Sequence, residues 1–218
     1  MTIKENIQQI ESKIQSLQSN AKLIAVTKSV GEQEMREVFN AGVTAMGENR
    51  VPSLLEKQAV LADIQKEIEW HFIGNLQTRP VKDMINQIDY LHSLDRMKLA
   101  KEIQKRAVKP VKCFLQVNVS GEDSKSGFSP DEVIEVVGEL AGYDKIIIVG
   151  LMTMAPIDAT DSELHEYFAK LKETQTKVAE KGFAHAPCTE LSMGMSQDYH
   201  IALEEGATYI RVGTSLYQ

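Results

Sequence analysis

The stretch Leu23-Ile24-Ala25-Val26-Thr27-Lys28 is a short apolar run that ends in a single lysine. A run of this length between polar segments is typical of a buried strand in a parallel sheet. We expect this strand to end at Lys28, with the ammonium group partly buried at the mouth of a core. Partial burial favours the neutral amine, which can form a Schiff base with an aldehyde. Most strand-end lysines are simply solvated, so the feature needs support from the rest of the chain.

Seven further apolar runs follow, each separated from the next by a longer segment with helical spacing. Their expected strand ends are Met46-Gly47, Ile73-Gly74, Ser93-Leu94, Val117-Asn118-Val119, Leu151-Met152, Leu191-Ser192 and Arg211-Val212. Alternating strands and helices predict a parallel sheet, and eight strands are the number that closes a (β/α)8 barrel. The predicted fold class is therefore α/β, as a single TIM barrel.

The helical segments carry boundary signals of their own. An extra helix before the first strand is predicted by the spacing of Ile7, Ile10, Ile14 and Leu17. Later helices are indicated by Met35, Val38 and Phe39 before Gly42, by a capped start at Ser129, Pro130 and Glu132, and by Leu164, Phe168 and Leu171 before Gly182. No repeat or Pro-, Gly- or Ser-rich linker interrupts the chain, so we predict one domain over residues 1–218.

The composition argues against several classes of protein. The 218 residues are 43% hydrophobic and 25% charged, which is ordinary for a chain that folds around its own core. A formal net charge of −7 would repel a phosphate backbone, so we expect no nucleic-acid partner. Cys113 and Cys188 lack metal-ligand spacing, so we expect no metal site. No apolar stretch reaches about 18 residues and the start does not look like a signal peptide, which favours a cytoplasmic protein without a membrane partner.

The unusual polar residues cluster at the expected strand ends. The carboxyl ends of the strands in such a barrel converge on one mouth, where the chemistry of the fold collects. Besides Lys28, these ends carry Gly47-Glu48-Asn49-Arg50, His71-Phe72-Ile73-Gly74-Asn75-Leu76-Gln77, Gly150-Leu151-Met152-Thr153-Met154, Leu191-Ser192-Met193-Gly194-Met195-Ser196 and Arg211-Val212-Gly213-Thr214-Ser215. The mouth is therefore the expected functional site.

The last two segments fit a phosphate group, because the loops after strands seven and eight often hold a phosphate in this fold. The expected contacts are the backbone of Gly194 and Gly213 and the hydroxyls of Ser192, Ser196 and Thr214. Ser196 is also expected to be the N-cap of a helix that runs to Gly206, and capping could be its whole role. For Gly213-Thr214 the plain alternative is a tight turn.

Arg211 lies within the apolar stretch Tyr209-Ile210-Arg211-Val212. A permanent charge in such a strand is costly unless something accepts its hydrogen bonds, so Arg211 needs a partner inside the protein. A bound ligand is one candidate. A structural ion pair with a strand-end acid such as Glu48 is the other.

In their order along the chain, these segments resemble a known family. The resemblance is carried by Ala25-Val26-Thr27-Lys28, Gly47-Glu48-Asn49, Trp70-His71-Phe72-Ile73-Gly74, Leu76-Gln77, Gly150-Leu151-Met152, Leu191-Ser192-Met193-Gly194-Met195-Ser196 and Arg211-Val212-Gly213-Thr214. The set is similar to the pyridoxal phosphate homeostasis proteins of the YggS/PROSC type. That resemblance implies a single-domain barrel similar to the N-terminal domain of alanine racemase, with pyridoxal 5′-phosphate bound through a Schiff base and no settled enzymatic activity.

The resemblance also implies roles for individual residues. Lys28 would be the Schiff-base lysine, with Asn49 near the cofactor ring and Arg211 facing the pyridine nitrogen. The phosphate end would be held by Ser192, Met193, Ser196, Gly213 and Thr214. How these contacts divide between Ser192 and Ser196 is left open. The departures from the family pattern are Pro52, Pro80 and Gln218, and none of them replaces an implied cofactor ligand.

The leading hypothesis is a protein that stores, buffers or hands over pyridoxal phosphate, with apo-enzymes that need the cofactor as candidate recipients. Arg211 cannot accept a proton, so it should leave the pyridine nitrogen unprotonated and the ring a weak electron sink. With the chain ending at Gln218, we expect no second domain of the kind that completes a racemase site, and we expect a monomer. Lys125 is a candidate second acceptor of the aldehyde, the alternative being a plain surface lysine.

Two other hypotheses are kept. A slow amino-acid racemase or lyase would use Lys28 as its base. A barrel for some other phosphorylated ligand would use Lys28 only to pair its charge. Turnover of amino acids would favour the former, and a protein that takes up no pyridoxal phosphate would favour the latter.

Overall fold

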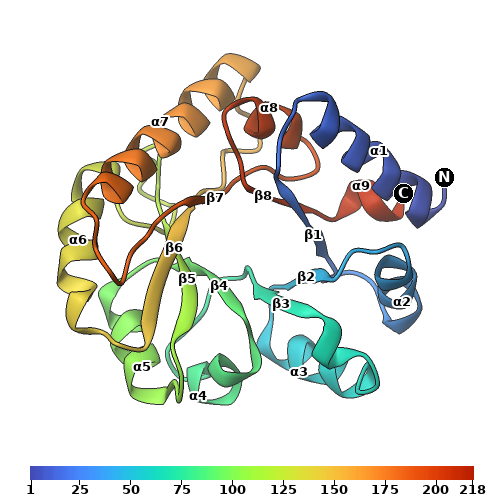
Figure 1. The fold of residues 1–218 in the computed structure, drawn as a ribbon, viewed down its shortest axis with the longest axis horizontal. Coiled ribbons are helices and arrows are strands. Elements are labelled where there is room, and N and C mark those ends of the chain that lie inside the picture. Colours follow the sequence, from blue (N-terminus) through green and yellow to red (C-terminus); the bar gives the residue numbers. More distant parts are fainter.

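Alternating strands and helices build a closed barrel (Figure 1). The computed structural model describes residues 1–218. Its eight strands pair in parallel in chain order, and the last strand closes the ring against the first. The strands are β1 (Lys22–Val26), β2 (Ala45–Glu48), β3 (Glu69–Phe72), β4 (Tyr90–Leu94), β5 (Val111–Gln116), β6 (Ile146–Met152), β7 (Glu190–Ser192) and β8 (Tyr209–Val212). The predicted α/β class and TIM barrel are confirmed.

Helices surround the ring of strands on its outside (Figure 1). The α-helices are α1 (Ile3–Ser16), α2 (Glu32–Asn40), α3 (Val51–Val60), α4 (Val81–Met84), α5 (Met97–Arg106), α6 (Val133–Glu139), α7 (Asp161–Glu180), α8 (Tyr199–Glu204) and α9 (Thr214–Tyr217). The short 3-10 helices are η1 (Gln65–Glu67), η2 (Ile85–Gln87), η3 (Pro130–Glu132) and η4 (Leu140–Gly142). The extra helix predicted before the first strand is α1. Its buried Asn6 amide donates to the carbonyl oxygens of Leu216 (2.9 Å) and Gln218 (3.1 Å), which ties the two ends of the chain together.

Three strands end earlier than the sequence predicted. The observed ends are Val26 rather than Lys28 in β1, Phe72 rather than Ile73-Gly74 in β3, and Gln116 rather than Val117-Asn118-Val119 in β5. At β1 the reason is a turn. The Val30 N–H donates to the Thr27 carbonyl oxygen (3.2 Å), so the backbone has left the sheet at Lys28. The apolar runs located these strands correctly but not the point at which pairing stops.

The helix boundaries follow the predicted signals more closely. The second helix, α2, ends before Gly42, and α7 ends before Gly182. At Ser129 both the N–H (3.3 Å) and the hydroxyl (2.8 Å) donate to the Glu132 carboxylate, which fixes the start of the segment. The first turn after Ser129 is η3, and it continues directly into α6.

Two apolar layers stabilise the barrel. The larger layer lies between the strands and the surrounding helices and includes Ile7, Ile10 and Ile14 of α1. The smaller layer lies inside the barrel and consists of Ile24, Ala45, Tyr90, Phe114, Met152 and Tyr209. Because side chains alternate across a strand, Tyr209 and Arg211 of β8 share the interior face. The interior therefore holds charged groups beside apolar ones.

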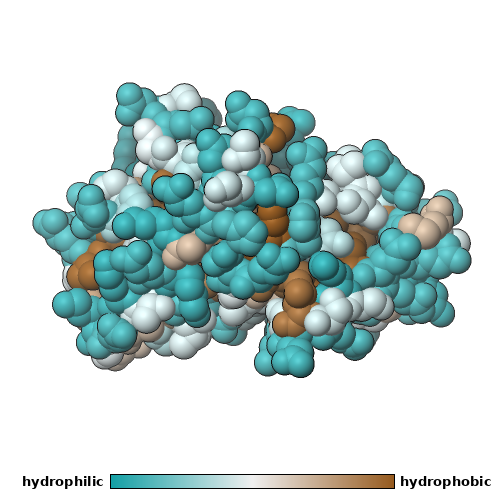
Figure 2. Space-filling view, turned by 90° about the horizontal axis from the view of Figure 1, so that it is seen from above, coloured by the Kyte–Doolittle hydropathy of each residue, from teal (hydrophilic) through white to brown (hydrophobic).

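The face of the molecule in Figure 2 is mostly hydrophilic, with small apolar patches between the polar side chains. None of the helices combines the length and the apolar character needed to cross a membrane. Cys113 and Cys188 are buried and free, and burial raises the pKa of both thiols to about 12. They therefore act as small apolar side chains.

Candidate functional site

Lys28 lies at the mouth of the barrel, in the turn between β1 and α2, and its side chain is exposed. The expected partial burial of its amine is therefore wrong. The cause is the early end of β1, which places Lys28 two residues beyond the strand instead of on its last position. The amine is open to solvent and to incoming molecules.

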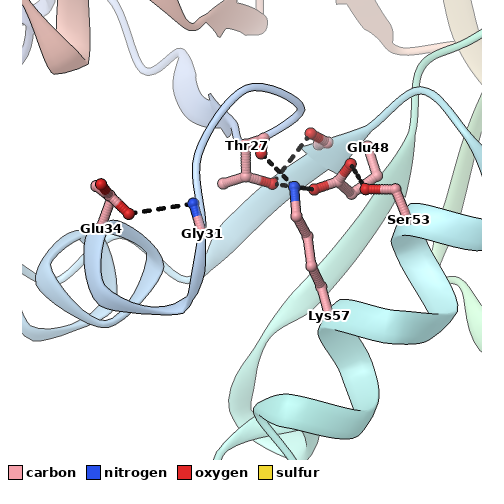
Figure 3. A network of polar contacts seen from close by, with 7 residues as sticks. Thr27, Gly31, Glu34, Glu48, Ser53 and Lys57 are labelled. Carbon is pink, nitrogen blue, oxygen red and sulfur yellow. Dashed lines mark hydrogen bonds and ion pairs between the residues drawn. The ribbon is translucent and has the colours of Figure 1, made fainter.

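A buried carboxylate fixes the start of this turn (Figure 3). Glu48, at the end of β2, is fully buried and accepts hydrogen bonds from the hydroxyls of Thr27 (2.8 Å) and Ser53 (3.3 Å). Lys57 of α3 reaches the same carboxylate and also donates to the Thr27 carbonyl oxygen. Thr27, directly before Lys28, is therefore anchored through both its side chain and its backbone.

The far end of the turn is fixed as well. The Gly31 N–H donates to the Glu34 carboxylate (3.1 Å) in the first turn of α2 (Figure 3). Thr27 holds one end and Gly31 holds the other, and Lys28 lies between them. The backbone of the lysine is thus positioned while its side chain stays exposed.

Arg211 of β8 is buried in the barrel interior, with 3% of its surface exposed. Its guanidinium donates to the Ser192 hydroxyl of β7 and, through Nη2, to the Thr153 carbonyl oxygen (3.0 Å). Burial lowers the pKa of Arg211 to about 10, so the group is still cationic at neutral pH. The alternative ion pair with Glu48 is wrong, because the guanidinium donates to Ser192 and Thr153 while Glu48 pairs with Lys57.

The turn that carries Lys28 follows β1, and Arg211 lies on the neighbouring strand β8. In the register of β1 against β8, Ile24 lies opposite Arg211. Gly213, two residues further on, packs so closely against β1 that an added Cβ would lie 3.2 Å from the Val26 Cβ. The segment that leads from β1 to Lys28 therefore starts beside Gly213 at one rim of the barrel, and Arg211 lies on the strand that leads to Gly213.

Ser196 joins the loop after β7 to the loop after β8. Its hydroxyl accepts hydrogen bonds from the N–H groups of Gly213 and Ser215, both at 3.3 Å. The prediction that Ser196 caps a helix running to Gly206 is wrong, since that helix, α8, begins only at Tyr199. The serine hydroxyl therefore joins two loops at the mouth and does not cap a helix.

The other predicted phosphate residues divide into two groups. Thr214 is exposed at the start of α9, beside Gly213. Ser192 and Met193 are fully buried, and the Met193 N–H donates to the Tyr209 carbonyl oxygen (3.2 Å). The structure therefore gathers Ser196, Gly213 and Thr214 at the mouth and places Ser192 and Met193 behind it.

Gly194 holds the loop after β7 in a shape that only glycine allows. Its φ angle is +100°, in the region that side chains disfavour. An added Cβ would also lie 2.7 Å from the Ala202 Cβ of α8. The loop can therefore pass directly over α8, which sets the position of Ser196.

Asn49, directly after β2, is half-buried at the same rim. Its backbone lies against Gly74, where an added Cβ would be 2.1 Å from the Asn49 carbonyl oxygen. The Ile73 N–H also donates to the Glu48 carbonyl oxygen (2.9 Å). The loops after β2 and β3 are held together, which fixes the backbone of Asn49.

A cavity of about 290 Å³ opens at this rim, between the loops after β3, β5, β6 and β7. Its lining includes Asn75, Asn118, Lys125 and Met154. Lys125 is partly exposed and pairs with Glu122 at 3.2 Å. The lysine predicted as a second acceptor therefore lines a cavity on the carboxyl-end side of the barrel. Two larger cavities, of about 460 and 730 Å³, lie at the opposite rim.

A line of buried polar side chains behind Arg211 was not predicted from the sequence. The Ser192 hydroxyl lies 2.8 Å from His92 Nδ1, and His92 Nε2 lies 2.8 Å from His71 Nδ1. His71 Nε2 in turn lies 2.7 Å from the Glu69 carboxylate. The only signal in the sequence was the presence of both histidines in otherwise apolar strands.

The groups at the mouth fit a small phosphorylated aldehyde with a ring acceptor. Lys28 offers an amine that can attack a carbonyl carbon. Arg211 offers a cation that donates hydrogen bonds and cannot accept them. The close approach of Gly213 to β1, with the Ser196 hydroxyl beside it, suits an anionic group.

A closed parallel barrel with a lysine in the turn after its first strand, an interior arginine and glycine loops after its last two strands defines an alanine racemase-like barrel. The family model described as "Alanine racemase, N-terminal domain" matches residues 1–218. The alanine racemase of Corynebacterium glutamicum superposes with a TM-score of 0.77 over 99% of this chain and 60% of its own, at 17% identity. At that identity the likeness shows a shared fold alone.

Within this class, the more similar curated relatives share one name. The pyridoxal phosphate homeostasis protein of Aquifex aeolicus is 40% identical over 200 residues, which cover 90% of this chain and 86% of the relative. PipY of Synechococcus elongatus, solved with pyridoxal phosphate bound, is 33% identical, with a TM-score of 0.90 over 100% of both chains. The chain belongs to the family of pyridoxal phosphate homeostasis proteins, which confirms the resemblance drawn from the sequence.

Proposed function

We propose that the protein binds pyridoxal 5′-phosphate at the carboxyl-end mouth of its barrel and holds it for other proteins, as part of vitamin B6 homeostasis. The observation that carries this proposal is the placement of Lys28 and Arg211 after and within neighbouring strands, beside loops joined by Ser196. PipY supports it, because a protein with the same fold has been solved with this cofactor bound.

The proposed covalent contact is made by Lys28. When bound, the cofactor supplies an aldehyde that reacts reversibly with amines. The anchored turn presents the Lys28 amine at the mouth, and its exposure lets an incoming amine reach the same carbon. Asn49, on the fixed loop after β2, is proposed to lie along the cofactor ring.

The phosphate is proposed to bind Ser196, Gly213 and Thr214. These residues combine hydroxyl donors with a glycine backbone that an anion can approach closely. The phosphate contacts of Ser192 and Met193 stay predictions. Both residues are buried, and both already make hydrogen bonds inside the protein.

Arg211 is proposed to face the pyridine nitrogen. Its guanidinium can donate a hydrogen bond to that nitrogen but cannot accept a proton from it, so the nitrogen stays unprotonated. An unprotonated ring is a weak electron sink. This property suits a racemase or a protein that holds the cofactor better than an aminotransferase.

Release to a recipient is proposed to involve a second amine. Lys125 lines the cavity at the mouth and is a candidate for this step. The recipients would be apo-enzymes that need the cofactor, in the cytoplasm, and the barrel would act as a monomer.

Reactivation of such an apo-enzyme by the loaded barrel, compared with an equal amount of free cofactor, measures hand-over. Sedimentation of the loaded protein measures its oligomeric state.

The decisive experiment is capture of the covalent link. Purified protein incubated with pyridoxal phosphate should turn yellow. Borohydride reduction and peptide mass analysis should then place one cofactor on the peptide that contains Lys28. Lys109→Ala, an exposed lysine away from the mouth, is the matched control and should leave the labelling unchanged. A colourless protein without label would overturn the proposal.

Turnover separates holding from catalysis. Coupled assays with L-alanine, L-serine and other amino acids should show rates far below the roughly 1 s⁻¹ at the low end of the usual enzyme range. Rates at or above that value would replace the holding role with a racemase or lyase activity that uses Lys28 as its base.

A further inference from the structure

A continuous line of buried polar atoms crosses the barrel from Arg211 to the opposite rim. It runs from β8 through Ser192 of β7 and His92 of β4 to His71 of β3, and it ends on the Glu69 carboxylate. Glu69 stands at the start of β3, and 31% of its side chain is exposed. The line thus begins beside the proposed cofactor ring and ends in solvent on the other side of the barrel.

Both histidines are held neutral. Each is fully buried, and burial lowers the pKa of both, most strongly that of His92. Aromatic rings cover their faces. Tyr90 stacks on His71 at 4.6 Å between ring centroids, and Phe114 stacks on His92 at 4.3 Å.

The direction of the hydrogen bonds follows from the two ends of the line, which are a donor at Arg211 and an acceptor at Glu69. Arg211 can only donate, so it donates to Ser192. The hydrogen bond to His71 keeps the pKa of Glu69 below its ordinary value, so this carboxylate can only accept.

With both rings neutral, one arrangement satisfies every bond. The Ser192 hydroxyl donates to His92 Nδ1, His92 Nε2–H donates to His71 Nδ1, and His71 Nε2–H donates to the carboxylate. Both histidines must then carry their proton on Nε2. Reversing the line would leave His71 Nε2 without a proton against an ionised carboxylate.

We propose that Ser192, His92, His71 and Glu69 form a positioning relay that orients Arg211 toward the cofactor's ring nitrogen, and that Ser192 serves this relay instead of binding phosphate. The inference rests on the proposed function. In the relay the Ser192 proton is directed to His92 and a lone pair is given to Arg211, so the hydroxyl has no proton left for an anion. The phosphate is then bound by Ser196 and the loop after β8.

Charged and phenolic groups near the Glu69 end also bear on its titration. They are Lys22 of β1, Lys112 of β5, Asp89 before β4, Tyr90 of β4, Glu190 of β7 and Tyr209 of β8. Of these groups, Lys22 and Lys112 favour the ionised form of Glu69. The test variants leave these positions unchanged, so that only the relay itself is altered.

The first test reads the histidines directly and needs no cofactor. Nitrogen-15 NMR of histidine-labelled protein should show His71 and His92 as neutral rings with the proton on Nε2, from about pH 6.5 to 9. Partly exposed His165 and His200 serve as internal references. A proton on Nδ1 of either buried ring, or an imidazolium at neutral pH, would overturn the relay.

The second test asks whether the relay acts on the cofactor. Ser192→Ala and His92→Phe should each weaken cofactor affinity by roughly tenfold or more, the usual value of a hydrogen bond to a charged group. Both should also shift the absorption maximum of the bound cofactor and its pH profile. The control Phe114→Leu alters packing on the same ring without removing a polar atom, and it should keep the wild-type spectrum. Equal effects in all three variants would mean that the relay is only structural.

The third test separates Ser192 from phosphate binding. Inorganic phosphate alone, titrated as a competitor of the cofactor, should bind Ser192→Ala as well as wild type and should bind Ser196→Ala several-fold more weakly. Loss of phosphate binding in Ser192→Ala would overturn the assignment. Failure of the proposed function looks different, because wild type itself would then not take up the cofactor.

Discussion

The two cations of the proposed site stand in opposite environments. Lys28 is exposed on a turn, and only the backbone on either side of it is anchored, by Thr27 and Gly31. Arg211 is buried, and its own guanidinium is held by Ser192 and the Thr153 carbonyl oxygen. A group that must exchange its bound partner needs access, whereas a group that orients a ring needs rigidity. The β1 side therefore suits reversible chemistry, and the β8 side suits fixed recognition.

Removing the Lys28 amine, the group proposed to exchange its bound partner, should have the largest effect, on covalent labelling. Lys28→Ala should abolish the borohydride-fixed label completely, while phosphate and ring contacts keep some reversible affinity. The free energy of unfolding should change by less than about 0.5 kcal/mol, because the side chain is exposed. Peptide mass analysis and urea unfolding measure the two quantities. A label that persists on another lysine of the barrel mouth would shift the exchanging role away from β1.

Loss of the Lys57–Glu48 ion pair, which anchors Thr27, should give the next largest effect. Lys57→Met leaves the fully buried Glu48 without its ion-pair partner, which should cost about 3–5 kcal/mol of unfolding free energy. Lys177→Met breaks an exposed pair with Glu173 on α7 and should cost less than about 1 kcal/mol. Urea unfolding of both variants makes the comparison. Similar losses of unfolding free energy in the two variants would show that the Lys57–Glu48 pair does not anchor the Lys28 turn.

The sequence predicted what depends on local pattern. Each apolar run located a strand, and the alternation of runs with helical spacing led to the closed barrel. The choice of the mouth also followed, because strand ends in a barrel converge wherever the chain goes between them. These features need no knowledge of which side chains meet.

What the sequence did not predict depends on contacts between distant residues. His92 and Ser192 are 100 positions apart, and nothing in either neighbourhood indicates that they touch. Ser196 looks like a helix cap by its residue type, but its hydroxyl is taken by the N–H groups of Gly213 and Ser215. The early end of β1 likewise depends on a turn, in which the Val30 N–H donates to the Thr27 carbonyl oxygen, and residue types alone do not indicate it.

The stability contributed by the buried histidines behind Arg211 should fall in acid. The folded-state pKa of His71 and His92 lies below the ordinary 6.5, so the unfolded chain binds more protons as pH falls below about 6.5. Stability from these rings is therefore fully present above that pH and is lost below it. His92→Phe should flatten this decline by up to about 1.4 kcal/mol per pH unit. Urea unfolding across the range measures the slope.

The control for this slope is His200→Phe, since His200 is a partly exposed histidine of α8 outside the barrel interior. It should leave the acid dependence unchanged. If His92→Phe and the control lose stability in parallel with wild type, acid does not act through the buried rings, and the rigidity assigned to the β8 side must come from packing alone.

The smallest expected effect separates affinity from covalent chemistry within the mouth itself. Thr214 is exposed like Lys28 but follows β8, so it should contribute to recognition and not to exchange. Thr214→Ala removes one hydroxyl donor and should weaken cofactor affinity about fivefold, near 1 kcal/mol, while the borohydride label still reaches Lys28. Ser215→Ala, one residue further, keeps the backbone N–H that reaches Ser196 and should bind as wild type does. Equilibrium titration followed by absorbance gives the affinities. If both variants weaken binding equally, the loop after β8 acts through its backbone shape, and the division between an exchanging β1 side and a recognising β8 side does not extend to this hydroxyl.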